Sequence, residues 1–320
     1  METSFSPPLD PCTYDLRIGT VGYEYSEWEG VLYPNGIEKE TYLRLYCERF
    51  STLELDFTFY TMPKAAQMRD ILARALGSSA GQAQFQNQLI QKLPVQEPSG
   101  RAPTDFSVIA HSSLTHRIDP FTWSRSLRTF LKGIEPLAEA DRLCAVLLVF
   151  PFSFRYREEE RRYLDKLLKA LETYPLAAYS LAVEFQNSEW LTLRVIEELK
   201  NRNVALCTLD MPRMEGRPPI SDIVTSDLAY IRFLGRAAPG VLTASSNSSS
   251  IEEGARNTEE GLWCPDLYRY KSEELALWIP RILSMSAQAS KIRIFFGNRR
   301  EGSAPLDACT LAELVRAAGL

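Results

Sequence analysis

Short apolar runs alternate along the chain with longer segments in which apolar residues recur at helical spacing. Eight runs have the length and composition of buried strands, and most of them precede a helical pattern. Strands that are apolar on both faces are typical of a parallel sheet covered by helices. The pattern predicts a single (β/α)8 TIM-type barrel, with strands at residues 16–22, 52–57, 106–110, 143–150, 180–185, 204–210, 228–234 and 292–296.

A doubly wound open sheet is the alternative fold. Its main sequence signal is a G-x-G-x-x-G turn after the first strand, and residues 19–22 (GTVG) do not match it. A short helical turn is expected near 220–225, between the sixth and seventh strands, and a closing helix over 310–318.

Two segments interrupt the repeating pattern. Residues 77–104 are rich in Gln, Ser, Gly and Pro, and residues 236–270 contain a serine-rich run. Such composition cannot supply a strand of the sheet, so both are interpreted as insertions. The chain is therefore predicted to be one domain over 1–320, with the barrel at about 16–318, one insertion after the second helix and one after the seventh strand.

Charge and cysteine usage narrow the function classes. The chain has 36 Lys and Arg against 41 Asp and Glu, so its net charge of -5 makes nucleic acid an unfavourable partner. Its six cysteines form no C-x-x-C pair, which is typical of reduced thiols. We expect a cytoplasmic protein without signal peptide or membrane contact, because no apolar run approaches the roughly 20 residues that a bilayer requires. The sequence leaves its oligomeric state open.

Several polar residues fall at the carboxyl ends of the predicted strands, where barrel proteins place their chemistry. Glu54 and Glu184 form a candidate general acid and base pair, and Arg232 is a candidate anchor for an anion. Isolated charges are costly to bury, so these groups are expected to pair with one another or with a ligand. A polar plug that closes the barrel is the structural alternative. Further candidate ligand-binding residues are Thr20, Asp56, Asp210 and Asn298.

Glu54, Glu184 and Asp210 could also hold an oxygen-seeking cation such as Mg²⁺ or Mn²⁺. The chain has only two histidines and neither an H-x-H nor an H-E-x-x-H motif, so the metal signal is weak. Tyr60 and Trp190 could form stacking walls for a ligand, or pack the loops over the barrel. His116 follows the third strand, where a loop histidine is either a capping residue or a catalyst.

Seven short motifs follow one another in a fixed order along the chain. They are residues 18–23 (IGTVGY), 28–34 (WEGVLYP), 53–60 (LELDFTFY), 114–116 (LTH), 183–185 (VEF), 230–236 (YIRFLGR) and 270–275 (YKSEEL). In this order they resemble the YecE-like family, also called domain of unknown function 72, over about residues 17–298. The resemblance implies a barrel of the TIM type related in shape to sugar isomerases, without an established activity. The family residues kept here include Glu54, Tyr60, Glu184 and Arg232, whereas Ile109 stands where the family commonly has a lysine.

Three functions are consistent with these observations. The first is a barrel protein that binds a small polar or anionic, sugar-like ligand at its carboxyl-end mouth, with acid/base chemistry of an isomerase or hydrolase type. The second is a non-catalytic barrel that binds a ligand or a protein. The third is a metal-dependent phosphodiesterase or nuclease, which the acidic net charge and the scarcity of histidine disfavour.

Overall fold

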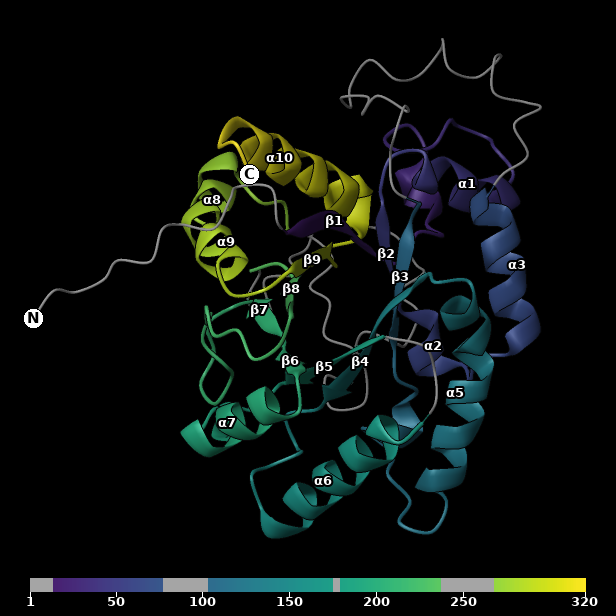
Figure 1. Cartoon of the computed structure of the whole chain (residues 1–320). Helices are drawn as coiled ribbons and strands as arrows, with labels where there is room; N and C mark the ends of the chain where they lie inside the picture. Colours follow the sequence, from purple (N-terminus) through teal and green to yellow (C-terminus); the bar gives the residue numbers. More distant parts are fainter. Residues whose placement is uncertain (1–13, 77–102, 175–178, 237–267) are drawn as a thin grey trace, which may run out of the picture.

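The computed structural model describes residues 14–76, 103–174, 179–236 and 268–320. Nine parallel strands form a nearly closed barrel with helices around it (Figure 1). The predicted α/β barrel is thereby confirmed. Its strands are β1 (Asp15–Val21), β2 (Thr52–Leu55), β3 (Asp105–Ile109), β4 (Leu143–Phe150), β5 (Ser180–Phe185), β6 (Val204–Leu206), β7 (Thr208–Asp210), β8 (Leu228–Phe233) and β9 (Lys291–Phe296).

The order of strands explains how the barrel closes. The sheet runs β6-β5-β4-β3-β2-β1-β9-β8-β7, so β6 and β7 stand at its two ends. Only Cys207 separates these two strands in the chain, and its amide donates to the Val183 carbonyl of β5 at 2.8 Å. The strand predicted at 204–210 is therefore one strand broken at Cys207, with its first half paired to β5 and its second half to β8.

A threonine side chain takes the place of a neighbouring strand beside β6. The Leu206 amide donates to Thr225 Oγ1 at 2.7 Å, and this hydroxyl donates to the Val204 carbonyl at 2.6 Å. Thr208 Oγ1 likewise donates to the Ser221 carbonyl at 2.9 Å. The helical turn predicted near 220–225 is wrong, because this segment lies along the broken strand and is held there by side-chain hydrogen bonds.

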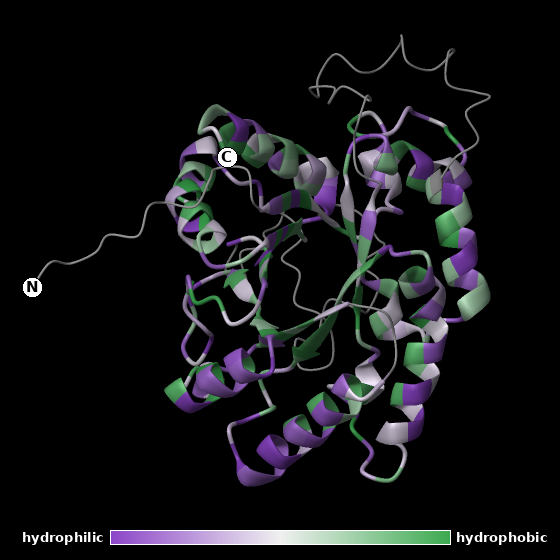
Figure 2. Cartoon of the chain, in the orientation of Figure 1, coloured by the Kyte–Doolittle hydropathy of each residue, from purple (hydrophilic) through white to green (hydrophobic). Residues whose placement is uncertain are grey.

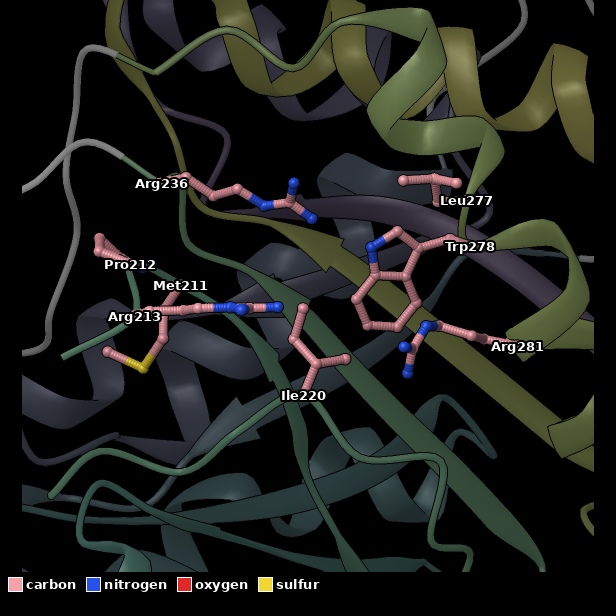
Figure 3. A pocket seen from close by; sticks show the side chains of 8 residues that line it. All are labelled: Met211, Pro212, Arg213, Ile220, Arg236, Leu277, Trp278 and Arg281. Carbon is pink, nitrogen blue, oxygen red and sulfur yellow. The ribbon is translucent and has the colours of Figure 1, made fainter. Parts of the chain in front are cut away.

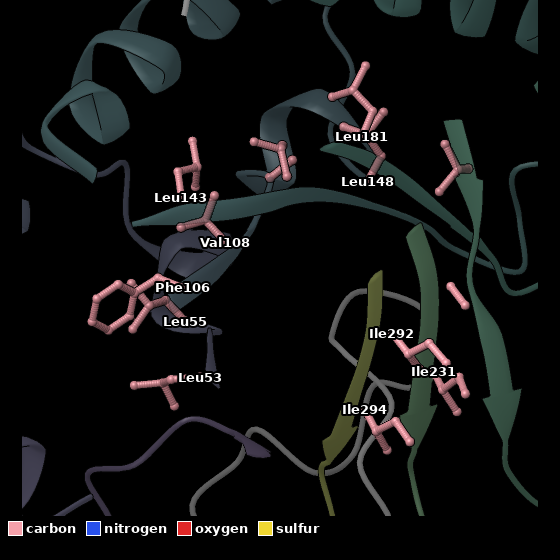
Figure 4. Packing of buried hydrophobic residues seen from close by; sticks show 14 of the residues in the cluster. Leu53, Leu55, Phe106, Val108, Leu143, Leu148, Leu181, Ile231, Ile292 and Ile294 are labelled. Carbon is pink, nitrogen blue, oxygen red and sulfur yellow. The ribbon is translucent and has the colours of Figure 1, made fainter. Parts of the chain in front are cut away.

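The helices cover the outer face of the barrel with their apolar sides (Figure 2). Leu164, Leu167, Leu168 and Leu171 are buried along one face of α6, as their spacing predicts. Side chains from the outer faces of the strands complete this core (Figure 4). The helices are α1 (Tyr42–Cys47), α2 (Phe57–Tyr60), α3 (Ala65–Leu76), α5 (Trp123–Glu139), α6 (Glu158–Glu172), α7 (Leu193–Asn201), α8 (Ser272–Ala276), α9 (Ile279–Ser286) and α10 (Ser303–Ala317).

Charged side chains close the amino-terminal end of the barrel. Arg293 Nη2 lies 2.7 Å from Asp105 Oδ2 and 2.6 Å from Asp15 Oδ2, and Arg17 Nε lies 2.9 Å from Asp15 Oδ1. The Arg293 side chain is 2% exposed. Because the charges pair with one another across β1, β3 and β9, they hold this end of the barrel together.

The predicted insertions at 77–104 and 236–270 lie almost wholly outside the described residues. The helix α3 ends at Leu76 before the first one, and β8 ends at Phe233 before the second. Their placement outside the barrel wall stays a prediction. Among the described residues, no helix combines the length and the apolarity needed to cross a membrane.

Gly19 allows β1 and β2 to approach closely. A Cβ atom at this position would lie 2.1 Å from the Thr52 carbonyl oxygen and 2.9 Å from the Tyr46 hydroxyl. We expect Gly19→Ala to lower the free energy of unfolding by about 1–3 kcal/mol through overpacking. Urea unfolding of both proteins measures this loss. An unchanged midpoint would show that the two strands can separate without cost.

Candidate functional site

Three charged side chains from different strands meet inside the barrel. Arg232 of β8 places Nη2 2.9 Å from Glu54 Oε1 of β2 and Nη1 2.5 Å from Glu184 Oε2 of β5. None of these side chains is more than 2% exposed. Strand alternation turns them inward, because Val183 and Phe233, their chain neighbours, pack in the outer core. The structure thus brings together three of the residues that the sequence singled out.

Two more side chains complete this cluster. The Tyr230 hydroxyl donates to Glu54 Oε2 at 2.5 Å, and Gln186 Nε2 donates to Glu184 Oε1. Arg217 Nη1 then donates to Gln186 Oε1 at 2.7 Å and links the cluster to the segment after β7. We call Glu54, Glu184, Gln186, Tyr230 and Arg232 the interior network.

The interior network holds two carboxyl groups against one guanidinium. Burial raises the pKa of Glu54, and the attraction of Arg232 and the hydrogen bond from Tyr230 only partly oppose this shift. A carboxyl group whose pKa is raised toward neutrality can hold a proton and deliver it to a bound molecule. The pair of carboxyl groups therefore has the composition of an acid/base site.

The network also retains unused hydrogen-bonding capacity. Arg232 Nε has no hydrogen-bond partner within the described part of the chain, although the residue is 2% exposed. An unsatisfied buried N–H is energetically unfavourable, and a water molecule or ligand can satisfy it. Cys207 Sγ lies 3.9 Å from Glu184 Oε2, the same oxygen that accepts from Arg232. Burial raises the pKa of this thiol well above its usual value, so it is not a nucleophile at neutral pH.

Asp56 belongs to a second cluster at the carboxyl ends of β1, β2 and β9. Its Oδ2 accepts from the Tyr25 hydroxyl at 3.2 Å and lies 3.7 Å from Arg299 Nη1. Burial raises the pKa of Asp56, and Arg299 and Tyr25 oppose the rise. The Arg299 guanidinium also lies 5.4 Å from the centre of the Tyr25 ring. These groups form a polar rim beside the interior network.

Thr20 and Trp190 point away from the barrel interior. Thr20 Oγ1 donates to the Gly22 carbonyl at 2.7 Å and lies 3.1 Å from the Tyr46 hydroxyl, within the outer core. Trp190 stacks on Phe185 with ring centres 4.7 Å apart, and its ring N–H donates to a backbone carbonyl at 2.7 Å. Both side chains tie loops to the outside of the barrel.

Asp210 and Asn298 also face away from the network. Both oxygens of Asp210 accept from Arg236, at 2.7 and 2.5 Å, and Oδ2 also accepts from the Trp278 ring N–H at 2.8 Å. Asn298 Nδ2 lies 2.6 Å from the Tyr268 carbonyl oxygen and from Asp307 Oδ2. These contacts join the carboxyl ends of β7 and β9 to the helices outside them.

The predicted cation site does not assemble. Glu54 and Glu184 lie on Arg232, whereas Asp210 points outward to Arg236. Across the described ranges, no group of three His, Cys, Asp or Glu side chains is arranged to hold a metal ion. The three carboxylates therefore do not form a common ligand set for Mg²⁺ or Mn²⁺.

Tyr60 and His116 both contact Phe59 at the mouth. Tyr60 is 55% exposed, and its ring meets Phe59 edge-on with centres 5.0 Å apart. The His116 ring meets Phe59 edge-on at 4.7 Å, and its Nδ1 lies 3.0 Å from Thr115 Oγ1. Burial, with a smaller contribution from Arg117, lowers the pKa of His116 to about 4. His116 is thus a neutral ring at physiological pH and not a general acid.

The low pKa of His116 should make stability depend on pH. The folded state binds the proton less tightly than the unfolded chain, whose histidine pKa is 6.5, so stability falls as pH drops from 6.5 to about 4. We expect the stability of wild type relative to His116→Gln to fall by about 2–3 kcal/mol across this window. Urea unfolding at a series of pH values measures the difference, and a difference that does not vary with pH would contradict the shift.

Sequence reasoning missed part of the interior network. Tyr230 lies two residues before Arg232, so strand alternation alone places both side chains on the inner face of β8. That signal was present in the sequence. Arg217 gave no such signal, because it follows β7 in a segment without periodic pattern.

Taken together, the fold and the network define a (β/α)8 barrel protein with a buried charged site near the carboxyl ends of its strands. The family model "Protein of unknown function DUF72" matches residues 17–76 and 95–319. The chain therefore belongs to the DUF72 family, as its motifs predicted.

Relatives of known sequence or structure agree with this assignment. The UPF0759 protein YunF of Bacillus subtilis (strain 168) is 23% identical over 290 residues, which cover 89% of this chain and 90% of that protein. A DUF72 family structure from Thermotoga maritima MSB8 has a TM-score of 0.70 at 27% identity, and the match covers 95% of this chain and 100% of the other. One from Enterococcus faecalis V583 has a TM-score of 0.69 at 20% identity, covering 94% and 95%, and shows the shared fold.

Proposed function

We propose that the interior network binds a small polar or anionic molecule, such as a sugar or a sugar acid, and exchanges protons with it. The observation that carries this proposal is the pair of buried carboxyl groups on one buried guanidinium. They lie on β2, β5 and β8, near the strand ends where barrel enzymes perform their chemistry. Functional sites are also where buried ionisable groups with shifted pKa values cluster.

The two carboxyl groups have different surroundings, and this favours different roles. Glu184 accepts from Arg232 at 2.5 Å and from the Gln186 amide, so we assign it as the base. Glu54 has a raised pKa, so we assign it as the acid. In an isomerase-type step, Glu184 removes a proton from the carbon next to a carbonyl group while Glu54 protonates the carbonyl oxygen. The product is an enediol, and reversal at the neighbouring carbon completes the isomerisation.

Two arginines near the mouth favour an anionic ligand. The Arg217 guanidinium lies 4.8 Å from the centre of the Phe152 ring, and Arg299 lies beside Tyr25. Both follow strands at their carboxyl ends, so they place positive charge at the entrance to the network. A clustered positive potential raises the local concentration of anions and steers them inward.

Solvent-deuterium incorporation tests the proton exchange even when the product is not identified. The full chain is incubated with xylose or glucuronate in deuterium oxide, and NMR follows loss of the proton on the carbon next to the carbonyl. We expect Glu184→Gln to reduce incorporation about a hundredfold or more. The exposed Glu197 of α7 provides the matched control, and Glu197→Gln should leave the rate unchanged. Incorporation that survives Glu184→Gln would refute the assigned base.

A non-catalytic barrel is the second candidate function. It is favoured by the pairing of both carboxyl groups with Arg232, because internally paired charges can serve as a fixed plug. In that case neither xylose nor glucuronate exchanges its carbon-bound proton for solvent deuterium. Calorimetry then also detects no binding of either molecule to the wild-type protein.

A further inference from the structure

The cavity outside the barrel wall and the barrel interior differ in how their polar groups are paired. The cavity measures about 420 Å³ and lies beside α8 and α9 (Figure 3). Its guanidiniums Arg236 and Arg281 are paired with the carboxylates of Asp210 and Asp222, at 2.5 Å in each case. Inside the barrel, by contrast, the Ser107 hydroxyl forms no well-aligned hydrogen bond with any described residue. Such a buried polar atom is uncommon, and a catalytic role is one explanation for it.

Ser107 lies next to Glu54 on the inner face of the barrel. The two residues are direct partners in the register between β3 and β2. Phe106 and Val108, the chain neighbours of Ser107, pack in the outer core, so strand alternation turns the Ser107 side chain inward. Ser107 is fully buried. A hydroxyl group therefore stands beside the carboxyl group to which the proposed function assigns the role of acid.

Tyr230 of β8 reaches both of these groups. Its hydroxyl donates to Glu54 Oε2 at 2.5 Å. Burial and the charge of Glu54 raise the pKa of Tyr230 well above its usual value, and the neighbouring Ser107 hydroxyl opposes this rise. Tyr230 thus keeps its proton, and its single hydroxyl hydrogen can point to Glu54 or to Ser107 but not to both. In the arrangement observed it points to Glu54, and Ser107 is left without an aligned partner among the described residues.

A proton on Glu54 must take the oxygen that faces Tyr230. Arg232 Nη2 lies 2.9 Å from Glu54 Oε1, and a guanidinium can only donate, so a proton on Oε1 would meet another donor. The proton therefore sits on Oε2. Tyr230 must then accept from Oε2 and turn its own hydrogen elsewhere, and the Ser107 hydroxyl is the buried acceptor beside it.

We propose that Tyr230 is a positioning residue whose hydroxyl hydrogen turns between Glu54 and Ser107 as Glu54 loses and gains a proton. With Glu54 ionised, Tyr230 donates to the carboxylate. With Glu54 protonated, Glu54 donates to the Tyr230 oxygen and Tyr230 donates to Ser107 Oγ. Only the proton on Glu54 is gained or lost, and every other covalent bond stays as it is. We call this exchange the Tyr230 switch.

The Tyr230 switch rests on the proposed function in one respect, the assignment of Glu54 as the acid. A general acid in a buried site has to be stable with its proton and without it. An unpaired buried donor or acceptor is unfavourable in either state. The switch gives Glu54 a satisfied hydrogen bond in both states, because Tyr230 donates to one and accepts from the other.

Carbon-13 NMR of the glutamate carboxyl groups in the full chain tests the switch without any ligand or turnover. The Glu54 signal is assigned by its loss in Glu54→Gln, and its titration is compared among variants. Tyr230→Phe removes the donor to the ionised carboxyl group, so Glu54 should bind its proton about tenfold more tightly or more. Ser107→Ala removes the acceptor that Tyr230 needs when Glu54 is protonated, so Glu54 should bind its proton about three- to tenfold more weakly.

A double variant shows whether Ser107 acts through Tyr230. Adding Ser107→Ala to Tyr230→Phe should change the proton affinity of Glu54 no further, because phenylalanine has no hydroxyl hydrogen to turn. Thr52→Val is the matched control, since Thr52 is also a fully buried hydroxyl without an aligned partner in the described part of the chain, two residues before Glu54. It should leave the proton affinity of Glu54 unchanged.

Two results would overturn the switch. One is an unchanged or increased proton affinity of Glu54 in Ser107→Ala, and the other is a Ser107 effect that persists in the double variant. The titration also stands apart from the deuterium experiment. Opposite effects of the two single variants, without deuterium exchange into xylose or glucuronate, would support the switch and count against the proposed function. Exchange that depends on Glu184, without an effect of Ser107→Ala on the titration, would support the function and refute the switch.

Discussion

Replacing Arg232 with methionine is expected to lower the free energy of unfolding by about 3–5 kcal/mol, because it leaves two carboxyl groups buried without a cation. Arg232 lies 2.9 Å from Glu54 and 2.5 Å from Glu184, and both carboxyl side chains are fully buried. Methionine retains most of the apolar stem, so the lost charge accounts for most of the effect. Urea unfolding at neutral pH measures the loss, and Arg128→Met on the exposed face of α5 is the control.

The pH dependence of this variant gives an independent check. Without the guanidinium, the folded state favours protonated carboxyl groups, so it binds more protons than the unfolded chain near neutral pH. The variant should therefore regain stability as the pH is lowered toward about 5. A variant that is as stable as wild type at neutral pH would mean that the guanidinium serves a ligand and not its two neighbours.

The apolar pattern predicted the fold because strands that are buried on both faces are typical of a parallel sheet covered by helices, and few folds contain such a sheet. The strand predicted at 143–150 has the same bounds as β4, and all eight of its residues are buried. Where the sequence has no hydrophobic periodicity, the element boundaries were predicted less accurately. Residues 310–318 were predicted to fall in a closing helix, and α10 contains nearly all of them, but its start at Ser303 was not predicted, because the chain turns at Gly302 with a φ of 71° before it enters the helix. Local turn geometry of this kind has no hydrophobic signature.

The candidate site was only partly predictable, because a position at a strand end does not define the direction of its side chain. Glu184 faces inward as alternation requires. Asp210 also ends a strand, but its neighbours Leu209 and Met211 occupy the inner face and Asp210 must point outward. The alternation of side chains along each strand therefore distinguishes the inward-facing Glu184 from the outward-facing Asp210. The partners of Asp210 come from segments far along the chain, and no local pattern could identify them.

The charges of the interior network should be strongly non-additive in their effect on stability. Glu54→Gln leaves Arg232 paired with Glu184 at 2.5 Å, and Glu184→Gln leaves it paired with Glu54 at 2.9 Å. We expect each single variant to unfold within about 1 kcal/mol of wild type, because one opposite charge remains. The double variant leaves a buried guanidinium alone and should lose about 3–5 kcal/mol. Urea unfolding of the four proteins gives the coupling energy, and additive small losses would show that Arg232 is stabilised by other groups.

A triple variant separates the structural role of these charges from their function. Adding Arg232→Met to the double variant removes every formal charge of the interior network, and neutral groups of similar volume often match or exceed the stability of a buried ion pair. The triple variant should therefore recover most of the stability that the double variant loses. If this uncharged barrel folds well, the wild-type charges are not required for folding, and the energetic cost of burying them is explained by ligand binding or proton transfer. Failure of the triple variant to recover would show instead that the network is a structural plug whose hydrogen bonds the fold requires.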